Sequence, residues 1–273
     1  MLILDLSKEA HKMPPQTLRV VYSAFRMAML HWVADPQWVI PNVIAPFVFT
    51  VVALTLFRTD PTGQFALYAV LGGGMMGMWG NTLYSSGFAI EFEKWQGTLE
   101  NVLAAPSNLM HVIAGRSVSN ALLGLTNMVA ILLIAAFGFR VSLGVANPIL
   151  FAVSLVLTLL SVSALGLIFA SAFVLSRSAQ VFTNGLEFPI YIISGSMFPV
   201  FVLGPFEPVS YVLGPKWGID AIREAATYGN VSIDFWKNIG IMLLITAVYI
   251  AIATVLFKFV EKKARRDGTL VEA

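Results

Sequence analysis

Six apolar stretches in this 273-residue sequence are each long enough to cross a lipid bilayer as a helix. A hydrocarbon core about 30 Å thick requires roughly 20 apolar residues in a helix, and only helices and closed barrels satisfy their own backbone polar groups there. The sequence therefore predicts an all-α integral membrane protein with one domain over residues 1–273. The predicted transmembrane spans are residues 38–57, 65–90, 117–139, 148–175, 181–203 and 239–257.

The composition excludes several classes of function. Apolar residues make up 58% of the chain and charged residues 12%, which is far from the balance of a soluble domain. There is no cysteine, so no thiolate can act as nucleophile or metal ligand. The formal net charge of +2 gives no indication of nucleic-acid binding. His11, His31 and His111 stand far apart, so we predict no metal site and no catalytic residues, and a membrane-bound enzyme is disfavoured.

The chain before the first span is amphipathic. Residues 1–16 form a polar tail, and residues 17–34 have the pattern of a helix that carries Arg19 and Arg26 among apolar side chains. Because an arginine at the centre of a bilayer costs about 2.5 to 3.5 kcal/mol, a helix lying in the headgroup layer is favoured over a seventh span.

The basic residues indicate the orientation. With a cytoplasmic N-terminus, twelve of the 17 lysines and arginines lie on the inner side, which is the side that positive charge favours. Both termini and residues 91–106 are then cytoplasmic, and residues 204–234 are outside. We therefore expect a multi-pass protein of the plasma (inner) membrane. The five basic residues left outside are Arg58, Arg140, Lys216, Arg223 and Lys237.

A short charged segment, residues 91–106, separates the second and third spans. Gly97 permits a sharp turn and Thr98 has the side chain of a helix N-cap, so a short cytoplasmic helix is expected to follow. The alternative is an ordinary solvated loop.

This segment, Glu-Phe-Glu-Lys-Trp-Gln-Gly-Thr-Leu-Glu-Asn-Val-Leu-Ala-Ala-Pro, resembles the signature of ABC type-2 permeases, the transmembrane subunits of drug, antibiotic and polysaccharide exporters. A second stretch, residues 188–199 (Phe-Pro-Ile-Tyr-Ile-Ile-Ser-Gly-Ser-Met-Phe-Pro), is similar to the family's fifth-span pattern. Trp95 and Gln96 stand where many members carry a basic residue.

The resemblance implies a permease subunit that pairs with a second copy, as a homodimer, and docks two ATP-binding-cassette ATPase subunits. ATP and Mg²⁺ would bind to those partners, because this sequence has no Gly-x-x-x-x-Gly-Lys-Ser/Thr motif to cradle phosphates. This chain is then a transport subunit without a cofactor, and not an enzyme. The residues that inherit an ATPase-coupling role from the motif are Glu91, Glu93, Lys94, Gly97, Thr98, Leu99 and Glu100.

Polar residues in the fifth span form a candidate translocation pathway. Asn184, Glu187, Tyr191 and Ser194 recur every three or four residues, which places them on one helical face. An ionisable group inside a span is a functional candidate, while the alternative is a glutamate that holds helices together. A proton-coupled secondary transporter that uses Glu187 without an ATPase is the competing function.

The outer segment, residues 204–234, is rich in proline and aromatic residues. The resemblance implies re-entrant helices that close the exit, with Phe198, Pro199, Phe206 and Trp217 as the outer gate. The alternative is an interfacial loop that covers the bundle. The expected cargo is amphipathic: a drug, an antibiotic, or a lipid-linked or glycan molecule.

Small and flexible residues mark the second span. Gly73 and Gly77 lie four apart on one face and let another helix approach closely, either within this chain or from a second subunit. Met75, Met76 and Met78 form either plain packing or an adaptable wall for cargo. In the third span, Asn120 and Asn127 share a face and are expected to join helices.

Overall fold

The computed structural model describes residues 16–34, 36–56, 64–80, 97, 109–139, 145–174, 185, 189–196 and 199–267. These residues form helices joined by turns, and none of them lies in a β-strand. The helices are α2 (Gln16–Ala34), α3 (Pro36–Leu56), α4 (Gln64–Trp79), α7 (Leu109–Phe137), α8 (Pro148–Val174), the 3-10 helix η2 (Val200–Phe206), α10 (Glu207–Ser210), α11 (Gly214–Thr227) and α12 (Ile233–Asp267).

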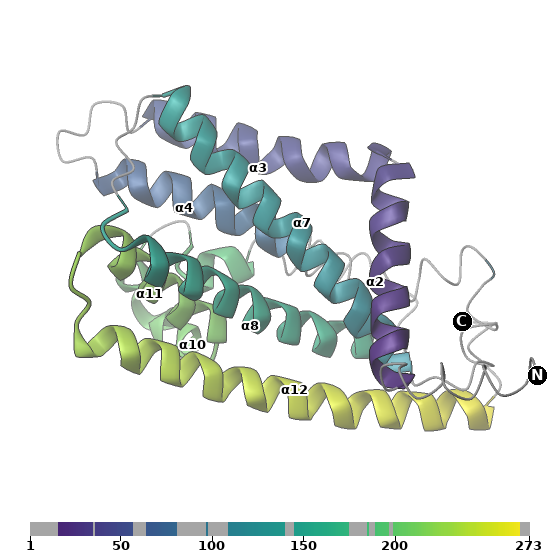
Figure 1. Cartoon of the computed structure of the whole chain (residues 1–273). Helices are drawn as coiled ribbons and strands as arrows, with labels where there is room; N and C mark the ends of the chain where they lie inside the picture. Colours follow the sequence, from purple (N-terminus) through teal and green to yellow (C-terminus); the bar gives the residue numbers. More distant parts are fainter. Residues whose placement is uncertain are drawn as a thin grey trace, which may run out of the picture.

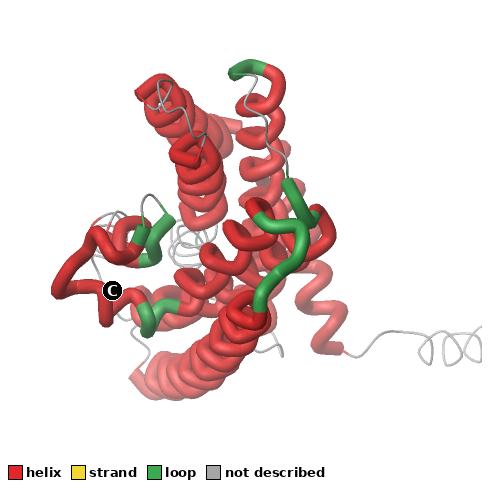
Figure 2. Tube along the Cα trace, turned by 90° about the vertical axis from the view of Figure 1, so that its left-hand side faces the viewer, coloured by secondary structure: helices red, strands yellow, loops and turns green. Residues whose placement is uncertain are grey.

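The long helices form a bundle whose members alternate in direction (Figure 1). α3 leads away from the end at which α2 lies, α4 runs back toward that end, α7 leads away again, and α8 returns. α12 also runs toward the end at which α2 lies, whereas α10 and α11 lie at the opposite end. Figure 2 views the bundle from this opposite end, where described turns and loops gather.

Three helices in the described part of the chain are long and apolar enough to cross a membrane. Their apolar portions are Met110–Phe137, Pro148–Ser171 and Ile233–Phe259, which correspond to the predicted third, fourth and sixth spans. α7 begins before the predicted residue 117, and α12 extends beyond 239–257 at both ends. Asp234 in the first turn of α12 suits the positive end of the helix dipole, which favours this longer helix.

The predicted fifth span, residues 181–203, is described at residues 185, 189–196 and 199–203. Its helix ends at residue 193 and does not continue to 203, because a local cap interrupts it. Gly195 has φ 74°, its N–H donates to the Ile192 carbonyl (3.1 Å), and the Ser196 N–H donates to the Tyr191 carbonyl (3.3 Å). This pair of bonds is the Schellman cap, and glycine adopts its left-handed residue without strain.

α4 is buried between α3 and α7. A Cβ atom on Gly73 would collide with the Thr50 side chain of α3, and one on Gly74 would collide with Met128 of α7. A Cβ on Gly77 would lie 3.1 Å from Asn127. The glycines of α4 are therefore used for packing within this chain.

The methionines and asparagines near this contact are also buried. Met75 and Met78 belong to the main hydrophobic core, and Met76 packs against it. Asn120 and Asn127 are buried on α7. The burial of these three methionines is thus explained by packing within the chain.

Candidate functional site

The end of the bundle opposite α2 carries a structured cap, which we define as residues 199–232. Its largest element is α11, which is packed between α8 and α12. Ile219, Ile222 and Ala225 of α11 are buried in the main core. A Cβ on Gly218 would collide with Thr158 of α8, so the backbones of α11 and α8 approach closely.

α11 runs antiparallel to α8 and alongside its first half. The backbone N–H groups of Ala146 and Asn147, just before α8, donate to the carbonyls of Ala226 and Ala225 at the end of α11, each at 3.0 Å. The start of α11 lies deeper, because a Cβ on Gly214 would collide with Ser161. At about 1.5 Å per residue, Ser161 is roughly 20 Å along α8. The cap thus reaches well into the bundle.

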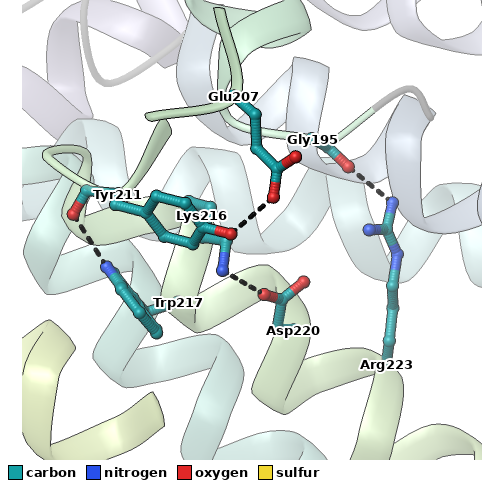
Figure 3. Close-up of polar contacts among 7 residues, drawn as sticks. All are labelled: Gly195, Glu207, Tyr211, Lys216, Trp217, Asp220 and Arg223. Atoms are coloured by element: carbon teal, nitrogen blue, oxygen red, sulfur yellow. Dashed lines mark hydrogen bonds and ion pairs between the residues drawn. The ribbon is translucent and has the colours of Figure 1, made fainter. Parts of the chain in front are cut away.

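A buried lysine holds the start of α11. Lys216 is only 7% exposed, and its Nζ atom forms an ion pair with Asp220 Oδ2 at 2.9 Å. The same Nζ lies 4.0 Å from the Trp217 ring centroid and 4.5 Å from that of Tyr211 (Figure 3). A buried ammonium needs such partners, because desolvation without them is costly.

Two more hydrogen bonds join the residues around Lys216. We call Glu207, Tyr211, Lys216, Trp217 and Asp220 the lysine cluster. The Tyr211 hydroxyl donates to Glu207 Oε1 at 2.6 Å, and the Trp217 Nε1–H donates to the Tyr211 carbonyl at 3.0 Å (Figure 3). The hydrogen bond to the Glu207 carboxylate raises the pKa of Tyr211 above its ordinary value. Trp217 is therefore fixed against neighbours within the cap.

Arg223 connects α11 to the Schellman cap of the fifth predicted span. Its Nη2 atom donates to the Gly195 carbonyl at 2.7 Å (Figure 3) and to the Ser196 carbonyl at 3.1 Å. Carbonyls just past a helix end have no partner in the helix, and a guanidinium can bond two of them at once. The family-like Ser-Gly-Ser sequence thus forms the helix end that Arg223 grips.

Tyr249 of α12 anchors the chain between α10 and α11. Its hydroxyl donates to the Val212 carbonyl at 2.9 Å and accepts from the Gly214 N–H at 3.3 Å. Sequence reasoning missed Gly195, Arg223 and Tyr249. Gly195 carried a readable signal, since a glycine followed by Pro199 is typical of a helix C-terminus.

The two described members of the predicted pathway are both buried. Tyr191 is fully buried, its hydroxyl donates to the Met76 carbonyl at 3.2 Å, and its ring meets Trp79 edge-on at 6.0 Å between centroids. The hydroxyl of the buried Ser194 donates to the Tyr191 carbonyl at 3.0 Å. Asn184 and Glu187 lie outside the described residues.

The structure describes three of the four predicted gate residues. Pro199 directly precedes η2, and Phe206 at the end of η2 is largely exposed, whereas Trp217 packs in the lysine cluster. Phe198 lies outside the described residues. Of the coupling motif, the structure describes Gly97 alone, which lies exposed in a turn with φ 67°. The members outside the described residues are Glu91, Glu93, Lys94, Thr98, Leu99 and Glu100.

The described residues form alternating helices, three of them of membrane length, with a cap at one end, and this arrangement defines a helical membrane protein. The model of the ABC-2 type transporter family matches residues 19–227, and the chain belongs to this family. The matched region runs from α2 to the end of α11 and so includes most of the cap. No curated protein matches the sequence closely enough for comparison. The chain is therefore a membrane component of a transporter and not a catalytic enzyme.

Proposed function

We propose that this chain is the permease subunit of an ATP-driven exporter in the plasma membrane, working as a homodimer with two separate ATPase subunits. The observation that carries the proposal is the family match over residues 19–227, which includes the segment 91–106. The sequence has no phosphate-cradling loop of its own, so ATP and Mg²⁺ would act in the partner subunits. Its cargo is proposed to be amphipathic.

Residues 91–106 are proposed to transmit the motion of the ATPase. A coupling element must be held in a defined shape if a contact on it is to bias the arrangement of the helices. The turn at Gly97, with φ 67°, supports such a shape, because that backbone region is strained for a residue with a Cβ. Glu91, Glu93 and Glu100 are proposed to contact the partner.

The cap is proposed to be the re-entrant outer gate. Support comes from α11, which begins beside Ser161 and ends beside the first residues of α8. A segment that enters a bilayer and returns must satisfy its backbone within the protein, and α11 does so by forming a helix against α8 and α12. In this orientation α2 lies at the cytoplasmic side, with both termini.

Reconstitution with the ATPase subunits tests the proposal. Glu93→Ala and Gly97→Ala should each lower ATP turnover and vesicle transport together. For Gly97→Ala the expected loss is about fivefold or more, because a residue with a Cβ is strained by roughly 1 to 2 kcal/mol in this backbone conformation. Gly240→Ala is the control, because Gly240 lies on α12 outside the cap, is exposed, and a Cβ there meets nothing within 4 Å. Normal ATPase stimulation in both variants contradicts the coupling role. Full transport without nucleotide contradicts the exporter assignment.

A further inference from the structure

One side of α2 is packed against the rest of the chain. A Cβ on Gly115 of α7 would collide with the Val21 carbonyl, and it would lie 2.8 Å from the Ala24 Cβ and 3.1 Å from the Phe25 nitrogen. Backbone and small side chains therefore meet directly at the crossing of α2 and α7. This crossing fixes which side of α2 faces away from the bundle.

The other side of α2 is a mixed cationic and apolar stripe. Arg19, Tyr22, Arg26, Leu30 and Val33 follow one another at spacings of three or four residues, so they share a face. All five are exposed, and the three apolar ones are more than half exposed. Neither arginine forms an ion pair or hydrogen bond with a residue in the described part of the chain.

Beyond its crossing with α2, the same side of α7 carries exposed apolar side chains. Val118 and Leu122 follow Gly115 on nearly the same side of α7, and both are exposed on a helix of membrane length. α2 crosses the bundle at the end toward which α12 carries its basic residues, among them the exposed Lys258 and Lys262 (Figure 1). A helix that lies across the ends of spans runs parallel to the membrane plane.

The chemistry of the stripe fits a phospholipid. A guanidinium offers a planar fork of donors that matches a phosphate, and tyrosine and leucine neighbours can enter the acyl boundary. Each large apolar side chain gains by leaving water, so a free stripe in water is disfavoured. An acidic protein surface would neutralise the two arginines, but it would supply no acyl chains for the apolar members of the stripe to enter.

We propose that the exposed face of α2 is a binding surface for anionic phospholipids, in which Arg19 and Arg26 hold headgroup phosphates. The assignment to the cytoplasmic leaflet rests on the proposed function, whereas the lipid preference itself does not. The surface anchors α2, and through Gly115 it anchors α7, at a fixed depth. The arginines are binding residues for lipid and take no part in handling cargo.

The test measures lipid selectivity of the full chain in phosphatidylcholine vesicles. Trace spin-labelled phosphatidylglycerol or phosphatidylcholine is added, and the motionally restricted fraction of each is compared by electron spin resonance. The unchanged chain should prefer phosphatidylglycerol. Arg19→Gln and Arg26→Gln should each reduce that preference by up to about fivefold, and the double variant should reduce it further than either single variant. High salt should weaken it in the unchanged chain.

Two control variants distinguish the effect of the arginine charges from a general effect on charge or folding. Lys237→Gln removes one exposed positive charge near the start of α12, at the other end of the bundle, and should keep the full preference. Arg19→Lys with Arg26→Lys keeps both charges and should retain most of it. An unchanged preference in the double glutamine variant overturns the proposal. The proposal is also overturned if the double glutamine variant keeps its lipid preference but binds the ATPase subunits less tightly. In that case the stripe is a contact surface for protein.

Discussion

At the scale of single residues, Arg223 joins two parts of the chain that lie 28 residues apart. Two of its hydrogen bonds go to backbone carbonyls at the Schellman cap, so removing the guanidinium leaves these acceptors without a charged donor. Hydrogen bonds to charged groups contribute about 1.5 to 3 kcal/mol each. Arg223→Ala should therefore lower the free energy of unfolding by about 2 to 4 kcal/mol, as measured by denaturant unfolding of the purified chain in detergent.

A graded series makes this measurement specific. Arg223→Lys keeps the charge but loses the fork of donors, so it should recover only part of the lost stability. Lys237→Ala, an exposed basic residue at the start of α12, should change stability by less than about 0.5 kcal/mol. Equal stability of the alanine and parent proteins at position 223 contradicts the bridging role.

At the scale of helices, the close crossing of α2 and α7 depends on the absence of a side chain at Gly115. An alanine there meets the backbone of Val21 and Phe25, which cannot rotate away as a side chain can. Gly115→Ala should separate α2 from α7 and destabilise the protein by about 1 to 3 kcal/mol, the usual cost of overpacking. Thermal unfolding and protease sensitivity of α2 measure the effect.

Gly240 provides the matched helical control for this substitution. It lies within α12, and a Cβ there meets nothing within 4 Å. Gly240→Ala should therefore be neutral or stabilising by up to about 1 kcal/mol, because alanine is the better helix former. If both alanine variants behave alike, close approach at Gly115 is not what holds α2 in place.

The helices also show what sequence reasoning can and cannot predict. The spans at 117–139, 148–175 and 239–257 were predictable because lipid requires a long apolar helix whatever it packs against. The early end of the fifth helix was harder to predict, since the apolar pattern continues past Gly195 and only the glycine and the following Pro199 mark the place where local backbone bonds end the helix.

The cap was harder to predict than any span. Arg223 binds the Gly195 and Ser196 carbonyls, and Tyr249 binds the backbone before α11. Contacts with backbone groups leave no pattern of charge or spacing in the sequence. The gate role of Trp217 is implied by the family resemblance and stays a prediction, whereas its place beside Lys216 follows from tertiary packing. Long-range polar contacts of this kind depend on the fold as a whole.

At the scale of the whole molecule, the bundle has two distinct ends, and the proposed coupling and gate roles depend on which end faces the cytoplasm. α2 and the end of α12 lie at one end, toward which α4 runs and near which α7 begins, and the cap lies at the other (Figure 1). The segment 91–106, which connects α4 to α7, can meet a cytoplasmic ATPase only if the α2 end is inside. The counting of basic residues predicts this orientation.

Single cysteines can determine the orientation directly, because the sequence contains none of its own and gives no background. Gly229→Cys lies in the exposed turn after α11, while Ser23→Cys and Lys262→Cys lie on exposed positions of α2 and α12. A membrane-impermeant maleimide applied to intact cells should label position 229 alone, and positions 23 and 262 only after the membrane is permeabilised. The reverse pattern places the coupling segment outside the cell, where no ATP-consuming partner could reach it, and it removes the basis of the proposed function.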